Sequence, residues 1–125
     1  MAAMLAYRPM ERPIGPALAL AALLATQAHA AGKEREFTHV LEPGKVHEEC
    51  ARLQPGEARR WSWTSDAPVD FNIHFHRGND VGYPVKRDAT KGESGTFEPD
   101  VAQDYCWMWT AKGARAKLTG RIGPK

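Results

Sequence analysis

The fold class is decided by the stretch Val69-Asp70-Phe71-Asn72-Ile73-His74-Phe75-His76, in which apolar and polar residues alternate. Side chains of a β-strand point alternately to its two faces, so this pattern gives the strand one apolar and one polar face. The apolar face has to pack against a second layer of the protein. The stretch therefore predicts a half-buried strand in a layered β-protein.

Shorter segments on both sides of this stretch also have the composition of strands. Clusters of Gly, Pro, Asn, Asp and Ser separate them, as is typical of turns. No segment after Ala30 has the 3.6-residue period of a helix. We expect an all-β fold, a small antiparallel β-sandwich, with an irregular small barrel as the alternative. The predicted strands are residues 37–41, 46–53, 59–64, 69–76, 81–85, 95–97, 105–110 and 115–122.

Length and charge limit the classes of protein to which the chain can belong. Its 125 residues are enough for one domain. The 17 Lys and Arg residues are interspersed among 15 Asp and Glu residues, with a net charge of +2. Because this leaves no basic patch, we expect no nucleic-acid partner.

Residues 1–30 have the features of a secretory signal peptide. Arg8 and Arg12 precede an apolar, Ala-rich run at residues 17–25, and small residues follow in Ala-His-Ala at residues 28–30. A bilayer-spanning helix takes about 20 apolar residues, so this run is too short to be an anchor. We predict cleavage after residue 30, one domain over residues 31–125, a periplasmic or extracellular location and no transmembrane anchor.

The chain has two cysteines, Cys50 and Cys106. Two cysteines form one disulfide or one pair of thiols, and they are too few for a common four-ligand zinc site. Because export delivers the chain to an oxidising compartment, the disulfide is favoured.

His74 and His76 are the residues whose pattern is typical of metal ligands. Two residues apart in a strand, their side chains lie on one face about 6.6–7 Å apart. With a third donor they can bind Cu or Zn, and the main candidate for this donor is His47. The alternative is that both imidazoles only form hydrogen bonds on a polar face. Other candidate third ligands are His39, Asp70, Asp80 and Met108.

A dense set of aromatic residues permits two interpretations. Such residues commonly fill the core of a thin sandwich. Alternation also places Cys106 on the strand face opposite Trp107, so a core-facing Cys106 would leave an exposed aromatic ladder. Such a ladder would be a surface that binds sugar, lipid or peptide. The residues of this candidate interaction surface are Trp61, Trp63, Tyr105, Trp107 and Trp109.

The sequence carries none of the common catalytic motifs. It has no glycine-rich phosphate loop, nucleophile elbow, paired zinc-binding histidines of a helix, or Cys-x-x-Cys. We therefore predict a binding or interaction module without catalytic activity or a required cofactor. Its partner would be a protein, glycan or small molecule of the cell envelope. The alternative function is that of a periplasmic copper- or zinc-binding protein that uses His74 and His76.

Several short motifs together resemble the GOLD (Golgi dynamics) domain, a small β-sandwich of cargo receptors in the early secretory pathway. The resemblance covers residues 46–122. Its motifs are Glu49-Cys50, Leu53-Gln54-Pro55-Gly56-Glu57, Val69-Asp70-Phe71-Asn72-Ile73, Gly95-Thr96-Phe97 and Tyr105-Cys106-Trp107.

The resemblance implies a recognition module of the lumen or the periplasm. It also implies a disulfide across the sandwich, which would join Cys50 to Cys106. The histidines at positions 74 and 76 are not part of the GOLD pattern, so the metal hypothesis rests on this sequence alone.

Overall fold

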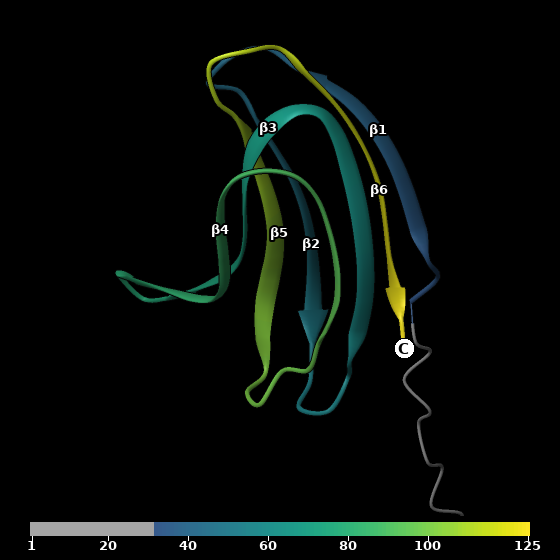
Figure 1. Cartoon of the computed structure of the whole chain (residues 1–125). Helices are drawn as coiled ribbons and strands as arrows, with labels where there is room; N and C mark the ends of the chain where they lie inside the picture. Colours follow the sequence, from purple (N-terminus) through teal and green to yellow (C-terminus); the bar gives the residue numbers. More distant parts are fainter. Residues whose placement is uncertain (1–31) are drawn as a thin grey trace, which may run out of the picture.

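A computed structural model describes residues 32–125, and the predicted signal peptide lies outside the described residues. Residues 32–125 form six β-strands and no helix (Figure 1). No helix in this range is long and apolar enough to cross a membrane. The strands are β1 (Arg35–Leu41), β2 (Val46–Leu53), β3 (Arg59–Arg77), β4 (Asp80–Phe97), β5 (Gln103–Ala111) and β6 (Ala116–Pro124).

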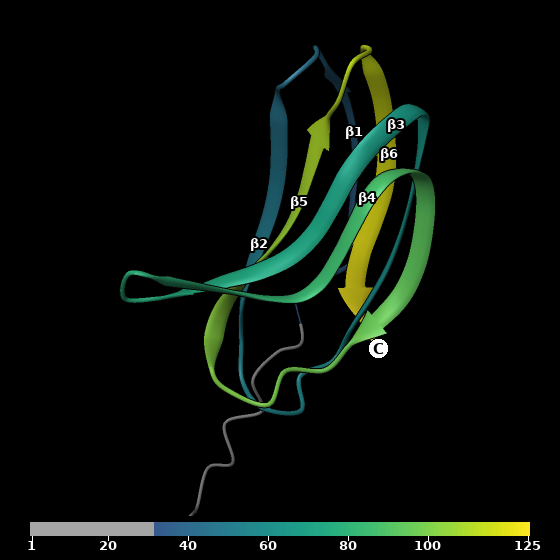
Figure 2. The same ribbon diagram turned by 60° about the vertical axis from the view of Figure 1, so that its left-hand side comes forward.

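The strands form one antiparallel sheet in the order β1-β6-β3-β5-β2, and β4 pairs with β3. The first part of β3 pairs with β6, whereas its second part pairs with β5. Because β3 bends between these parts, the sheet curls and its two halves face each other like the layers of a sandwich (Figures 1 and 2). The predicted all-β, antiparallel fold is confirmed.

The bend in β3 lies at residues 65–68, where the sequence had indicated a turn between two strands. The pairing with β4 changes register between Thr64 and Val69, as at a β-bulge. A bulge turns the strand direction without reversing the chain, so the strands predicted at 59–64 and 69–76 are one strand. In the same way β4 runs through the segments predicted separately at 81–85 and 95–97, and bends near Ala89, whose φ is 50°.

The aromatic residues of β3 and β5 fill the space between the two halves of the sheet. Tyr105, Trp107 and Trp109 are no more than 1% exposed, and Trp61 and Trp63 no more than 5%. The hypothesis of an exposed aromatic ladder is therefore wrong, and the interpretation as core is correct. The physical reason is that Cys106 takes the outer face of β5, which leaves the inner face to Trp107 and its neighbours.

The predicted disulfide between Cys50 and Cys106 is present, and no free cysteine remains. The two residues lie directly opposite each other in the register of β2 and β5. The bond therefore joins neighbouring strands on the outer face of one half of the sheet. The expectation of a bridge across the sandwich, taken from the GOLD resemblance, is wrong in this respect.

Candidate functional site

The ends of β3 and β4 form a hairpin that projects from the body of the sheet, as Figures 1 and 2 both show. Arg77 pairs with Asp80 across the two-residue loop Gly78-Asn79. Gly78 has a φ of 59°, and glycine takes this value without strain at the first loop position of a type II′ turn. The turn chemistry at residues 77–80 therefore builds a tight, extended ribbon.

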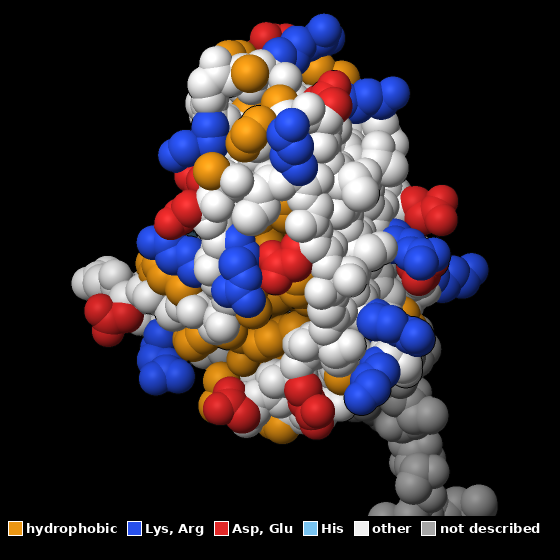
Figure 3. Space-filling model, in the orientation of Figure 1, with side chains coloured by type: hydrophobic (Ala, Val, Ile, Leu, Met, Phe, Trp, Pro, Cys, Tyr) orange, Lys and Arg blue, Asp and Glu red, His pale blue; other side chains and the backbone are white. Residues whose placement is uncertain are grey.

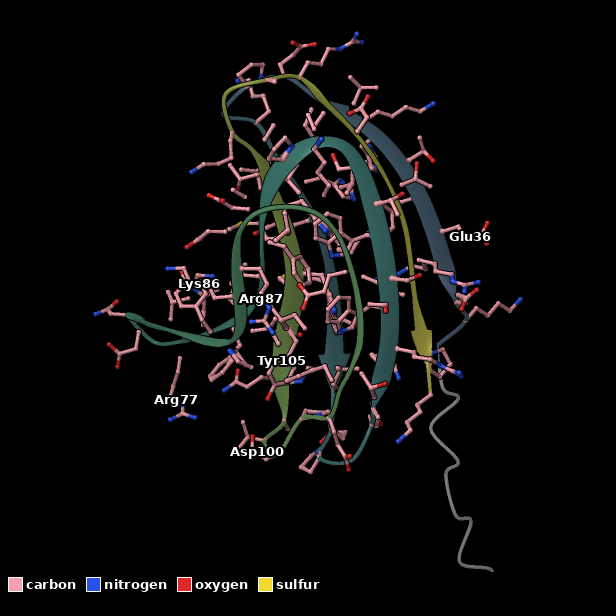
Figure 4. The ribbon with its side chains drawn as sticks, in the orientation of Figure 1. Glu36, Arg77, Lys86, Arg87, Asp100 and Tyr105 are labelled. Atoms are coloured by element: carbon pink, nitrogen blue, oxygen red, sulfur yellow. A yellow bond between two sulfur atoms is a disulfide. The ribbon has the colours of Figure 1, made fainter. Side chains whose placement is uncertain are left out.

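A cleft of about 520 Å³ lies between this hairpin and the loop that joins β4 to β5. We call it the hairpin cleft. Figure 4 labels Arg77 from its hairpin side and Asp100 and Tyr105 from its other side. Its lining residues are Phe75, Arg77, Tyr83, Pro84, Phe97, Glu98, Asp100, Val101 and Tyr105.

The inner wall of the hairpin cleft is aromatic and its rim is charged. The Tyr105 ring contacts those of Phe75 and Phe97, with centroids 5.4 and 4.9 Å away. The Tyr105 hydroxyl donates a hydrogen bond to the Val101 carbonyl at 2.9 Å, and burial raises the pKa of this hydroxyl, which keeps it a neutral donor at pH 7. The Arg77 guanidinium lies 5.7 Å from the Phe75 ring centre.

Large apolar side chains are also exposed around this cleft. Within residues 32–125, Tyr83 is 50% exposed, and Val81 and Val101 are more than a third exposed. In the space-filling view, hydrophobic side chains gather beside the hairpin, with both charge types around them (Figure 3). An apolar surface with a mixed charged rim is the composition of a protein-binding site.

His74 and His76 lie on the outer face of the sheet, with ring centroids 5.3 Å apart. His74 is 6% exposed, and its Nδ1 forms a 2.8 Å hydrogen bond with Asn72 Oδ1. Its Nε2 lies 3.6 Å from Glu48 Oε1. Because both ring nitrogens of His74 have protein partners, this arrangement agrees with the structural alternative. The metal hypothesis stays a prediction.

His74 predicts a pH dependence of stability. Burial lowers the pKa of His74 below its ordinary value near 6.5, and the neighbouring His76 adds to this, while Glu48 opposes it. The unfolded chain therefore takes up a proton at a higher pH than the folded chain. As a result, the free energy of unfolding falls as the pH drops through 6.5 and below.

We expect His74→Gln to reduce this loss of stability between pH 7.5 and pH 5. Urea unfolding of both proteins across that range measures it. A wild-type protein and a His74→Gln variant with parallel pH profiles would contradict the expectation.

The predicted third ligand, His47, lies away from His74 and His76. His47 pairs with Trp109 in the register of β2 and β5, whereas His74 pairs with Cys106 on the opposite face. The structure therefore does not bring the three predicted metal residues together. His47 instead contacts His39 and Glu49 at the seam between β1 and β2.

The other predicted donors have different neighbours. Asp70 forms a 2.8 Å ion pair with Lys112 and accepts a hydrogen bond from the Ala89 N–H. Asp80 lies in the hairpin, and Met108 pairs with Asn72 and Glu48 in the sheet. Glu48 also lies beside Cys50 and Cys106, but disulfide sulfurs offer no thiolate to a metal ion.

Sequence reasoning missed most of the hairpin cleft. Tyr83-Pro84 is a signal that could have indicated it, because proline within a strand is found at edges and bulges. The register of β3 and β4 does shift here, between Ile73 and Phe75. On the other side of the cleft, Glu98, Asp100 and Val101 belong to a loop whose position only the fold determines.

The chain is similar to known proteins in its fold and not in its sequence. No family model matches it, and no curated protein sequence matches it either, so the GOLD resemblance stays a prediction. Among solved structures, the mitogen from Yersinia pseudotuberculosis is similar, with a TM-score of 0.55 and 9% identity over 73% of this chain and 85% of that one. PliG from Aeromonas hydrophila, a periplasmic inhibitor of g-type lysozyme, has a TM-score of 0.51 and 10% identity over 78% of this chain and 90% of PliG.

Proposed function

We propose that this protein is an exported, non-catalytic module that binds a protein partner in the cell envelope through the projecting β3–β4 hairpin and the hairpin cleft. The observation that carries the proposal is the hairpin itself. It combines a projecting ribbon, an aromatic cleft at its base and exposed Val81 and Tyr83.

The chemistry of the cleft favours a protein over a glycan as the partner. A glycan site typically presents broad, exposed aromatic faces, whereas all four tryptophans of this chain are buried. Tyrosine and arginine are enriched at protein interfaces, and Tyr83 and Arg77 supply both here. The carboxylates of Glu98 and Asp100 on the other side of the cleft can pair with basic groups of the partner.

A narrow ribbon that projects from a domain fits a concave partner surface. Enzyme active sites are concave, and PliG, whose fold is similar, is an inhibitor of an enzyme. This supports an envelope enzyme as the first class of partner to examine, although the likeness itself concerns only the fold.

Two observations support export. The disulfide between Cys50 and Cys106 is stable in an oxidising compartment, and PliG is periplasmic. The signal-like features of residues 1–30 agree with both.

Photo-crosslinking in living cells tests the proposal. A photoreactive amino acid placed at Val81, on the hairpin, should form a discrete covalent adduct with one protein of the exported fraction. Adding Tyr83→Ala should remove most of this adduct, because a half-exposed tyrosine at an interface is a typical hot spot.

The matched control carries the same amino acid at Thr119, which is exposed on the outer face of β6. This face holds a larger hollow of about 740 Å³, whose lining includes Ser62, Ser94, Glu36 and Arg121 as well as Phe37 and Trp63. An adduct of equal yield from Thr119, or none from Val81, would contradict the assignment of the binding surface to the hairpin.

A further inference from the structure

The strands β1 and β2 lie at the two ends of the sheet order, and the curl of the sheet brings their side chains into contact. They share no backbone pairing in the described part of the chain. Side chains alone connect them along this seam. Arg35 of β1 forms a 3.3 Å ion pair with Glu49 of β2 and donates a 2.9 Å hydrogen bond to the Cys50 carbonyl.

Two histidines meet at the same seam. The rings of His39 from β1 and His47 from β2 lie with centroids 3.7 Å apart. His47 Nε2 is also 3.0 Å from Glu49 Oε1. One ligand atom from each of these three residues lies within 4.8 Å of the other two.

These separations are close to those of a metal site. Zinc binds imidazole nitrogen and carboxylate oxygen at about 2.0–2.2 Å with tetrahedral geometry, so two ligand atoms of one ion lie about 3.3–3.6 Å apart. The three donor atoms therefore need to move by at most about 1.5 Å relative to one another. The side chain of His39 is exposed on an edge strand, and rotation of its ring can supply this movement.

We propose that His39, His47 and Glu49 bind one divalent transition-metal ion across the seam between β1 and β2. Two imidazoles and one carboxylate suit Zn²⁺ and Cu²⁺, and the Irving–Williams order predicts that Cu²⁺ binds more tightly than Zn²⁺. Water fills the remaining coordination positions. The ion replaces the hydrogen bond between His47 and Glu49.

Arg35 is the competitor of the ion at this site. Its guanidinium occupies Glu49 Oε2 and places a positive charge beside the three donors. Removing that charge favours a bound cation. Substitution of Arg35 therefore distinguishes binding at this site from non-specific contact of a metal ion with a histidine.

The site differs from the pair His74 and His76. There, Asn72 occupies one ring nitrogen of His74, and the second histidine ring stands edge-on to the first at 83°. His39 and His47 belong to β1 and β2, whereas His74 and His76 belong to β3. Single substitutions can therefore separate the two pairs.

Isothermal titration of the purified exported protein, without an affinity tag, with ZnCl₂ and with chelated Cu²⁺ tests the proposal. We expect one ion per chain and tighter binding of Cu²⁺. His39→Ala and His47→Ala should each weaken binding at least tenfold, His76→Ala should leave it unchanged, and Arg35→Gln should strengthen it severalfold.

A second readout follows from the position of the site. An ion that joins two unpaired strand edges stabilises the folded state by mass action, so saturating Zn²⁺ should raise the melting temperature of the wild type. His39→Ala should abolish this rise, and its melting temperature without metal verifies that the variant folds. Binding weaker than millimolar, loss of binding in His76→Ala, or an equal rise in His39→Ala would overturn the proposal.

Discussion

Removal of the disulfide is expected to cost this protein a large part of its stability. Cys50 and Cys106 are separated by 56 residues, and on the chain-entropy model a loop of that length contributes about 4 kcal/mol to the free energy of unfolding. The total for a domain of this size is about 5–15 kcal/mol. The double variant Cys50→Ser/Cys106→Ser should therefore unfold at a much lower urea concentration than the wild type.

The position of the disulfide adds a local effect. β2 is an edge strand whose only backbone partner in the described chain is β5, and the disulfide joins these two strands. Hydrogen exchange of β2 amides should rise more than that of β6 amides when the bond is absent. The reduced wild type is the control, because it retains both cysteines. Equal urea midpoints for oxidised and reduced protein would contradict the expectation.

Truncation of Trp109 is expected to have an effect of similar size. Its side chain is fully buried and packs against the rings of Phe37, Phe71 and Trp63 at centroid distances of 4.9–6.4 Å. Replacing a buried tryptophan with alanine typically costs about 3–5 kcal/mol, because it removes apolar contacts and leaves a cavity. Urea unfolding of Trp109→Ala measures this loss.

Two control variants separate packing from hydrogen bonding at Trp109. The indole N–H has no hydrogen-bond partner among residues 32–125, so Trp109→Phe should cost less than Trp109→Ala. Val40→Ala, at a residue that is 48% exposed, should change stability by less than about 0.5 kcal/mol. A loss for Trp109→Ala no greater than that for Val40→Ala would mean that the aromatic set is not the core. Strong acrylamide quenching of tryptophan fluorescence would indicate the same.

The strands themselves could be predicted because alternation is a local property. The predicted segment 46–53 has the bounds of β2, and residues 69–76 lie within β3. Their continuity could not be predicted, because Ser65-Asp66-Ala67-Pro68 has the composition of a chain reversal. In the fold it forms a bend, since both flanking segments find partners in the same curled sheet.

Alternation also left open which face of a strand is buried. Cys106 and Trp107 necessarily point to opposite faces, and either was compatible with the core. The curled sheet places four tryptophans between its two halves, and this leaves the outer face to the disulfide. Burial of the larger apolar area decides between the two arrangements.

The two proposed sites differ in how far the sequence alone could indicate them. His39 and His47 lie at equal distances from Pro43, so a hairpin around that proline could have suggested their meeting. For the hairpin cleft, Tyr83-Pro84 indicates only one wall, because Phe75 and Val101 come together through the bend of the sheet and the path of a loop.

The affinity of the partner recovered by crosslinking is the measurement that most directly tests the central claim, that the hairpin is the binding surface. The purified partner is titrated into the wild type, Tyr83→Ala, Thr119→Ala and Val40→Ala. The account predicts a Kd at least tenfold weaker for Tyr83→Ala, a loss of about 1.4 kcal/mol, and changes below about twofold for the other two. An unchanged Kd for Tyr83→Ala, or a larger loss for Thr119→Ala, would contradict it.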